Sequence, residues 1–359
     1  MRLIHCADLH LDSGMKSLPD NIAEERHNEL LDTWSRLVTD AIDRNVRAVI
    51  LAGDIFDGER VSNKTLRFFL SEIQRAPQID FLYLSGNHDE GGVFRDYELP
   101  PNLKLFGDKW ACYAYDNVCI YGVSQTRQNY SLRISHELAK INFDPNQINI
   151  VVLHGAMASG AGGYNTINTS WFSGKPISYF ALGHIHQYKR WEQGGSIWCY
   201  PGCLEGRGFD ERGPKGYVLL DVGTHSLRDS FVPFSQRTFE EVSVDISDLR
   251  TTSGIRDALR KESSAIPVES LVKFVLYGTH DIDSFVDTSL LATEISSWFY
   301  FSKIKDDTKL SIDSSEYARD ISLKGEFLRV VQASGLSDKE KARTIKVGLS
   351  AIAGEAIKL

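Results

Sequence analysis

The first 90 residues alternate between short apolar runs and amphipathic segments, and this alternation constrains the fold more than any other feature of the chain. Residues 2–6, 46–51 and 81–84 have the composition of buried strands. The segments between them, 24–42 and 62–75, place apolar residues at helical spacing, and the second begins with a serine that can cap a helix. Strands that alternate with helices form βαβ units, so we predict an α/β fold with a largely parallel core.

A polar cluster follows each of these strands, and similar clusters follow two later apolar runs. The five clusters hold Asp8 and His10, Asp54 and Asp57, Asn87 and His88, His154, and His184 and His186. Sites in α/β sheets form outside the carboxyl ends of the strands, so clusters that are distant in sequence could converge there. Five of the ten histidines lie in these clusters. The alternative is that the clusters are only capped strand ends and polar core residues.

The side chains of these clusters offer imidazole nitrogens and carboxylate oxygens, with no thiolate. Such a set suits manganese, iron or zinc and argues against a structural zinc site. There are too many candidate ligands for one ion, so we predict two divalent ions that share a carboxylate. Because Asp8 and Asp54 would cancel only part of the positive charge of two ions, the site would favour an anionic phosphate.

Composition narrows the class of protein further. The formal net charge of −8 argues against simple coating of DNA through a basic surface. Five cysteines show neither zinc spacing nor a disulfide framework, which favours a reducing cytoplasm. The first eight residues have too few apolar side chains for a signal peptide, and no run approaches the roughly 20 apolar residues of a membrane span. We therefore expect a cytoplasmic protein with no membrane partner.

The middle and the end of the chain differ in character. Residues 110–123 predict a hairpin that turns at Asp116-Asn117, and the glycine-rich stretch 155–163, which lacks a P-loop ending, predicts a mobile loop. A small α+β unit follows residue 240, with strands at 242–246, 272–277 and 303–305 and helices at 254–261 and 290–299. We place the domain boundaries so that the parts are 1–238, 239–320 and 321–359.

Two further helices are predicted near the C-terminus. Residues 323–331 place five apolar side chains at helical spacing, and Gly335 can end that helix in a left-handed cap. Ser337 and Glu340 have the spacing of a capping box that opens a second helix. The apolar stripes of this hairpin can pack on their own domain or on a partner helix.

Written as motifs, the five polar clusters occur in a definite order. They are Asp-x-His at Asp8, Gly-Asp-x-x-Asp at Gly53, Gly-Asn-His-Asp at Gly86, a strand-end histidine at His154 and Gly-His-x-His at Gly183. This ordered set resembles the calcineurin-like metallophosphoesterase superfamily over about the first 235 residues. Within it, residues 4–11, 52–57 and 200–205 and the Lys215-Gly216-Tyr217 segment resemble the SbcD-type DNA-repair exonucleases. Those enzymes usually have a small hydroxyl residue where Cys203 stands.

The resemblance implies a fold, a cofactor and a role for each motif residue. The fold would be an α/β metallophosphoesterase sandwich of mixed β-sheets flanked by helices, and the cofactor two divalent ions, with manganese favoured over iron or zinc. The implied ligands are Asp8, His10 and His186 for the first ion, Asn87, His154 and His184 for the second, and Asp54 as the bridge. His88 would protonate the leaving oxygen or stabilise the transition state, with Asp57 fixing its tautomer.

The resemblance also implies a function. It indicates a metal-dependent DNA nuclease that hydrolyses phosphodiester bonds by a two-metal mechanism, together with an SbcC-like SMC-type ATPase, and it allows a homodimer. Residues 1–238 would be the nuclease domain, 239–320 a capping domain that helps to present DNA, and 321–359 a helical segment that docks on the ATPase. The alternatives are a small-molecule phosphodiesterase or phosphatase with the same site, and a non-catalytic scaffold, against which the complete ligand set argues.

Basic residues outside the clusters are candidate DNA contacts. They are Arg60, Lys64, Arg67, Lys189, Arg190 and Arg207, with Arg212 and Lys215 in the same glycine-rich loop as Arg207. These side chains could contact phosphates on either side of the cleaved bond. The alternative for each group is a solvated charged surface.

Overall fold

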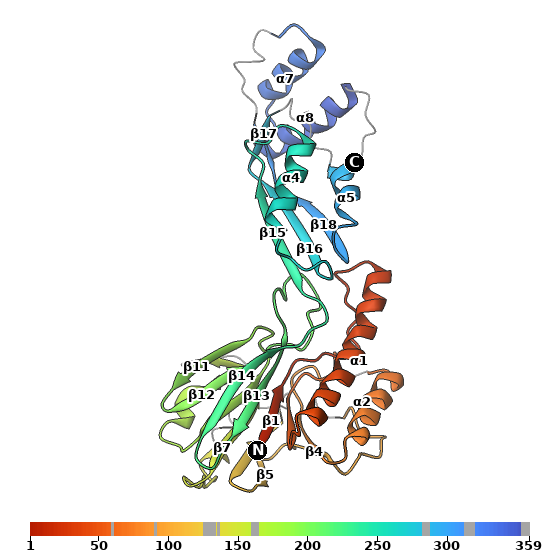
Figure 1. Cartoon of the computed structure of the whole chain (residues 1–359). Coiled ribbons are helices and arrows are strands. Elements are labelled where there is room, and N and C mark those ends of the chain that lie inside the picture. Colours follow the sequence, from red (N-terminus) through yellow and green to blue (C-terminus); the bar gives the residue numbers. More distant parts are fainter. Residues whose placement is uncertain are drawn as a thin grey trace. The chain divides into compact units, whose positions relative to one another are not determined.

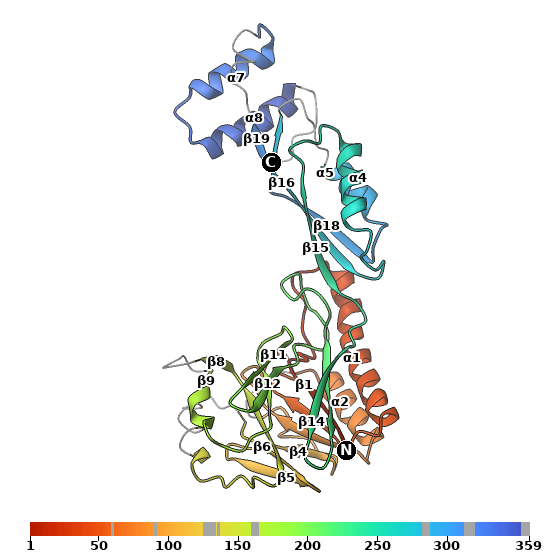
Figure 2. The same cartoon turned by 60° about the vertical axis from the view of Figure 1, so that its left-hand side comes forward.

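The computed structural model describes residues 1–58, 61–89, 92–124, 134, 137–158, 165–281, 288–311 and 320–352. The chain forms two compact units, Met1–Phe239 and Glu240–Leu359 (Figures 1 and 2). The further division of the second unit into a capping domain and a docking segment stays a prediction.

Two six-stranded mixed sheets form the core of the first unit, as far as its residues are described. The first has the order β14-β13-β1-β2-β3-β4, with β1 (Arg2–Cys6), β2 (Ala48–Ala52), β3 (Asp80–Leu84), β4 (Leu103–Leu105), β13 (Gly216–Val222) and β14 (Leu227–Pro233). The second has the order β11-β12-β10-β7-β6-β5, with β5 (Ala111–Tyr115), β6 (Val118–Gly122), β7 (Ile148–His154), β10 (Tyr179–Gly183), β11 (Lys189–Gln193) and β12 (Ser196–Tyr200). The predicted α/β sandwich of mixed sheets is confirmed.

The central strands of both sheets run parallel. β1, β2, β3 and β4 pair in parallel, as do β6, β7, β10 and β12, and antiparallel strands close the edges at β13–β14, β11 and β5. Ile50 and Leu82 of the first sheet share one buried core with Val152 and Ala181 of the second. Because these strands are covered on both faces, they read in the sequence as continuous apolar runs.

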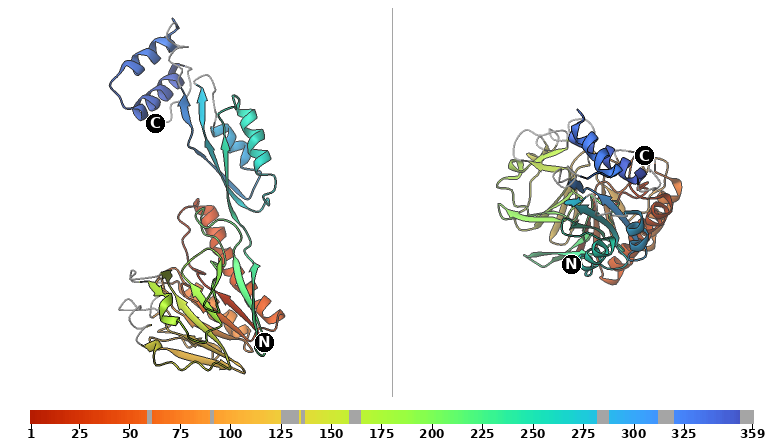
Figure 3. Two further views of the ribbon diagram at one scale, coloured as in Figure 1. Left: turned by 90° about the vertical axis from the view of Figure 1, so that its left-hand side faces the viewer. Right: turned by 90° about the horizontal axis from the view of Figure 1, so that it is seen from above.

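Helices α1 (Asp20–Asp43) and α2 (Asn63–Arg75) cover the first sheet on the side away from the second (Figure 3). Trp34 of α1 stacks on Phe69 of α2 with 4.9 Å between the ring centroids and meets Phe81 of β3 edge-on at 5.8 Å. The predicted serine cap is confirmed, because the backbone N–H of Thr65 donates to Ser62 Oγ at 3.2 Å. These helices pack on the sheet whose strands β1, β2 and β3 precede the first three polar clusters.

The predicted hairpin is confirmed: β5 and β6 pair antiparallel, and Asp116 in the turn has a φ of 44°. The glycine-rich stretch differs from the expected loop. Its first part forms β8 (Ala156–Ala158), which pairs in parallel with β9 (Thr166–Asn168) ahead of a short 3-10 helix, η1 (Thr169–Phe172). Residues 159–163 of that stretch lie outside the described residues.

The second unit is built on the sheet β15-β16-β18, with β15 (Phe239–Asp245), β16 (Leu271–Tyr277), β18 (Phe301–Asp306), α4 (Thr252–Glu262) and α5 (Thr288–Ile295), beside the pair β17 (Thr279–Asp281) and β19 (Lys309–Ser311). Val272, Phe274 and Leu291 are fully buried in its core. α5 ends before the predicted residue 299. After Ile295 the chain forms a tight turn, in which the Trp298 N–H donates to the Ile295 carbonyl, three residues back, at 3.0 Å.

The chain ends in the helix pair α7 (Leu323–Ala333) and α8 (Asp338–Ile352). The predicted capping box is confirmed, since Ser337 N–H donates to Glu340 Oε2 at 2.9 Å and Glu340 N–H donates to Ser337 Oγ at 3.4 Å. The expected left-handed cap at Gly335 is wrong: its φ is not positive, and α7 ends at Ser334 in an extended conformation. The chain therefore leaves α7 without a Schellman turn.

The apolar stripe of α7 divides between two directions. Leu328 and Val331 pack against Ile345 of α8, whereas Leu323 and Val330 remain 71% and 61% exposed. The two helices thus bury part of the stripe on each other. Among the helices that the structure describes, none is both long and apolar enough to cross a membrane.

Candidate metal centre

The structure brings the five polar clusters together at the carboxyl ends of β1, β2, β3, β7 and β10. Three of the five clusters contain residues with a positive φ, which is 52° at Asp8, 45° at His10, 51° at Asp54 and 102° at His184. Left-handed conformations cost free energy in residues other than glycine and concentrate at functional sites. Backbone hydrogen bonds of 3.0 Å from Asp8 to Gly53 and from His10 to Asp54 hold the first two clusters side by side.

Two motif glycines permit the close approach of these loops. A Cβ atom on Gly86 would lie 2.2 Å from Asp54 Oδ1, and one on Gly183 would lie 1.9 Å from the Ala52 carbonyl oxygen. Because no side chain fits there, glycine is required at both positions.

The first group of donor atoms comes from Asp8, His10 and His186. His10 Nε2 lies 3.2 Å from His186 Nε2, which in turn lies 4.0 Å from Asp8 Oδ1. His186 Nδ1–H donates to Glu211 Oε1 at 2.6 Å, so in the neutral imidazole the Nε2 lone pair faces the site. Burial lowers the pKa of His10 to about 4, which keeps that imidazole available as a ligand.

The second group comes from Asp54, His154 and His184, with Asn87 beside them. His154 Nε2 lies 3.2 Å from both Asp54 Oδ2 and Asn87 Oδ1, and His184 Nδ1 lies 3.1 Å from the same Asn87 oxygen. His154 Nδ1–H donates to the Ala52 carbonyl at 2.9 Å. The Nε2 lone pair of His154 therefore faces the oxygen atoms of Asp54 and Asn87, which also can only accept hydrogen bonds.

A shared carboxylate joins the two groups. Asp54 Oδ2, which faces His154, also lies 3.9 Å from His10 Nε2 in the first group. Its other oxygen accepts the backbone N–H of His88 at 2.8 Å. One oxygen atom thus faces both groups, as a bridging ligand must.

These residues fit a pair of divalent cations. Burial alone would lower the pKa of His154, but Asp54 raises it to about 9, so without a cation a proton occupies that space. Burial raises the pKa of Asp8 to about 7, against the opposing effect of His154. Cations would take the place of that proton and ionise Asp8, because opposite charge favours the carboxylate.

Comparison with known proteins now identifies the family. Residues 1–188, which contain all seven predicted metal ligands, match the calcineurin-like phosphoesterase family. The chain belongs to this family. It is a metallophosphoesterase, a hydrolase whose family uses a dinuclear metal site, and the two donor groups described above fit that site.

Its relatives include proteins of known and unknown role. YhaO of Bacillus subtilis, an uncharacterized metallophosphoesterase, is 26% identical over 300 residues, which are 78% of this chain and 72% of YhaO. The DNA double-strand break repair protein Mre11 of Haloferax volcanii is 26% identical over 278 residues, 75% of this chain and 60% of that Mre11. A dimetal phosphatase from Danio rerio aligns over 65% of this chain and 99% of its own at 12% identity, with a TM-score of 0.42.

In this phosphoesterase the side chain of His88 differs from those of the ligand histidines. It is 46% exposed, whereas the side chains of His10 and His154 are fully buried. Its Nδ1 lies 3.3 Å from Asp57 Oδ1, and this contact raises the pKa of His88. His10 Nδ1 lies 3.4 Å from the same Asp57 oxygen. Asp57 thus orients one ligand and the candidate acid together.

Two polar residues join the site for which the sequence gave no such role. Glu211 accepts hydrogen bonds from His186 Nδ1 and from Arg207 Nη2, the latter at 2.8 Å. Burial raises the pKa of Glu211, but these two partners outweigh burial and hold the pKa below its usual range. Arg207, expected as a DNA contact, is largely buried and also lies 3.7 Å from Asp57. Cys203 also contacts Glu211, with its Sγ 3.7 Å from Glu211 Oε2.

Two further charged residues, Lys215 and Asp89, lie inside the loops of the site. Lys215 is 2% exposed and donates to the His186 carbonyl at 2.9 Å, so the expected phosphate contact is wrong. Asp89 is also buried and accepts from the N–H groups of Gly86 and Ile55, which shapes the loop that presents His88.

The remaining candidate DNA contacts lie on the surface or outside the described residues. Lys64, Arg67 and Lys189 are exposed. Arg190 pairs with Asp229 at 2.9 Å and with Glu192 at 2.7 Å. Arg60 lies outside the described residues.

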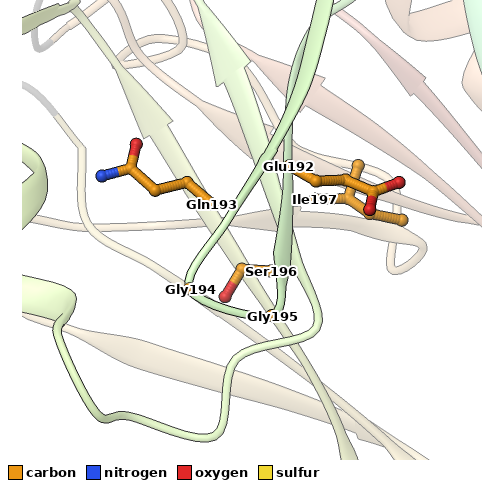
Figure 4. A pocket seen from close by; sticks show the side chains of 6 residues that line it. All are labelled: Glu192, Gln193, Gly194, Gly195, Ser196 and Ile197. Carbon is orange, nitrogen blue, oxygen red and sulfur yellow. The ribbon is translucent and has the colours of Figure 1, made fainter.

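A hollow at the turn between β11 and β12 is a separate feature (Figure 4). It is lined by Glu192, Gln193, Gly194, Gly195, Ser196 and Ile197. None of the candidate metal ligands lines it, so the candidate chemistry stays at the strand ends.

Proposed function

We propose that this phosphoesterase is a DNA nuclease of the SbcD type that hydrolyses phosphodiester bonds. The observation that carries the proposal is the extent of its similarity to proteins named Mre11. The match to Haloferax volcanii Mre11 covers 75% of the chain, more residues than the first unit contains, so it includes part of the second unit. A small-molecule phosphatase has no need of such a unit.

The residues of the site suit phosphodiester hydrolysis. Asp8, His10 and His186 would hold one divalent ion, and Asn87, His154 and His184 the other, with Asp54 between them. We propose manganese for both; the ions would neutralise the phosphate oxygens and lower the pKa of an attacking water.

His88 supplies the proton in this proposal. Its Nδ1–H donates to Asp57, which leaves Nε2–H of the charged imidazole to protonate the leaving oxygen. Because the His88 side chain is half-exposed, it can contact a polymeric substrate that does not itself reach the buried ligands.

A partner and a compartment complete the proposal. The ATPase partner would be of the SbcC type and would dock on α7 and α8, where Leu323 and Val330 remain exposed after the helices pack on each other. A homodimer would be compatible with this arrangement. All five cysteines are free thiols, which supports a reducing cytoplasm.

The test is hydrolysis of two substrates by one preparation. Manganese-loaded protein is mixed with end-labelled linear duplex and single-stranded DNA and, in parallel, with bis(p-nitrophenyl) phosphate. We expect metal-dependent shortening of DNA that Asp54→Asn abolishes. Turnover of the chromogenic diester with intact DNA, both alone and with the ATPase, would favour the small-molecule enzyme instead.

A further inference from the structure

The ligand histidines of the two metal groups have different partners behind them. His154 Nδ1–H donates to a neutral acceptor, the Ala52 carbonyl, at 2.9 Å. His186 Nδ1–H donates to a carboxylate, Glu211 Oε1, at 2.6 Å. A carboxylate behind a histidine raises its basicity and fixes its tautomer more strongly than a carbonyl does.

Glu211 is held as a charged group. Its Oε1 accepts from Arg207 Nη2 at 2.8 Å and its Oε2 accepts from the Arg207 backbone N–H at 2.8 Å. The side chain of Glu211 is only 7% exposed, so water contributes little to this arrangement. An arginine that contacts both oxygens keeps the carboxylate ionised and its orientation fixed.

The backbone of His186 is held by a second residue of the loop. The buried Lys215 Nζ donates to the His186 carbonyl at 2.9 Å and to Gln187 Oε1 at 3.2 Å. His186 and Glu211 are 25 residues apart in the sequence. The loop nevertheless brings Glu211 to the His186 ring and Lys215 to the His186 carbonyl.

The loop itself is anchored independently of the metal centre. Glu205 is 1% exposed, and it accepts from Arg26 Nη2 at 2.7 Å and from Thr33 Oγ1 at 2.8 Å. Glu205 and Glu211 are therefore two buried carboxylates of one loop, each paired with an arginine, and of the two only Glu211 contacts a candidate metal ligand.

We propose that Glu211, fixed by Arg207, is a positioning residue that selectively strengthens the first metal site through His186. The second site, whose His154 relies on a backbone carbonyl, does not depend on Glu211. The inference rests on the dinuclear site and not on DNA as the substrate. Arg207 then serves the metal centre, and its place in the loop is explained without a phosphate contact.

Manganese binding to metal-free protein tests this without any substrate. Titration calorimetry resolves two sites, and electron paramagnetic resonance distinguishes a coupled manganese pair from a single ion. In Glu211→Gln we expect one affinity to fall about 10–100-fold, the usual effect of losing such a partner, while the other stays unchanged. With two equivalents of manganese added, the wild-type protein should give the resonance signal of a coupled pair, and Glu211→Gln should give that of a single ion.

Glu205→Gln is the matched control, because it makes the same change in the same loop away from the ligands. It should lower the unfolding temperature and leave both affinities unchanged. Equal weakening of both metals in Glu211→Gln, an equal metal loss in Glu205→Gln, or unchanged binding in Glu211→Gln would each overturn the proposal.

Glu211→Asp covers the case in which the glutamine variant does not fold. It keeps the charge that Arg207 requires and only withdraws the oxygen from His186. A selective loss at one site supports the proposal, and two unchanged sites overturn it.

Discussion

His88 and His10 lie close together but occupy different environments. Their ring centroids are 4.9 Å apart, yet His10 is fully buried among acceptor atoms and His88 is 46% exposed. Burial lowers the pKa of His10, whereas Asp57 raises that of His88. One ring is thus suited to hold a cation and the other to carry a proton.

The first prediction concerns His88→Ala. We expect hydrolysis to fall by about 10²–10⁴-fold, the usual contribution of a general acid, while both metals stay bound. Turnover and elemental analysis measure the two effects, and His225→Ala, a change at an exposed turn, is the control. Loss of both metals from His88→Ala would show that His88 is a ligand.

The second prediction concerns Asp54→Asn. Asp54 Oδ2 faces both His10 and His154, so the loss of its charge should weaken both metal sites and remove most of the activity. Elemental analysis after dialysis checks the metal content. Two retained ions with near-normal turnover would contradict a bridging role.

At the scale of the element, helix α2 begins with a shared cap. Asp12 accepts the Ser62 backbone N–H at 2.8 Å and the hydroxyl groups of Ser62 and Thr65 at 3.0 and 2.7 Å. Ser62 in turn caps the helix through Thr65 N–H. The start of α2 therefore depends on a loop that follows the first metal-ligand motif.

The third prediction is the pH dependence of this cap. Partial burial would raise the pKa of Asp12, but hydrogen bonds from Thr65 and Ser62 lower it below 3.8. A carboxyl group whose pKa is lower in the folded state stabilises the protein above its unfolded pKa, and that stabilisation is lost as the pH falls through the folded value.

Asp12→Asn should therefore destabilise the protein at pH 7, by a margin that shrinks as the pH falls below about 4. Urea unfolding from pH 7 to pH 3 measures the difference. Ser62→Ala, which removes the cap itself, should cost about 1 kcal/mol. A difference between wild type and Asp12→Asn that is independent of pH would show that the Asp12 charge plays no part.

At the scale of the whole molecule, the terminal helix pair has a core of its own. Leu328, Val331 and Ile345 form a hydrophobic cluster separate from that of β15, β16 and β18. Removal of the chain after Asp320 should therefore leave the rest of the second unit folded. This separation allows the docking proposal to be tested.

The fourth prediction is that the truncated protein no longer co-purifies with an SbcC-type ATPase. The charge substitutions Leu323→Glu and Val330→Glu should have the same effect, since both side chains are exposed on α7. Val268→Glu, at a position 63% exposed outside this helix, is the control and should bind normally. Equal binding by the folded truncated protein would exclude the helix pair as the docking site.

Local patterns determined much of this protein. The strands β1, β2 and β3, the helices between them, the caps at Ser62 and Ser337 and the set of candidate ligands follow from local composition, spacing and periodicity. A residue that ends a strand has a position fixed by that strand, so motifs after parallel strands predict a shared site.

Tertiary structure decided the roles that depend on distant contacts. Glu211 and Lys215 reach His186 from an irregular loop, where no periodic signal reveals which side chain turns inward. The same holds for the stripe of α7, since the sequence shows that Leu323 and Leu328 are apolar but not that only Leu328 meets α8. Burial of a charge or an apolar side chain depends on what the rest of the chain places opposite it, and the local sequence does not contain that information.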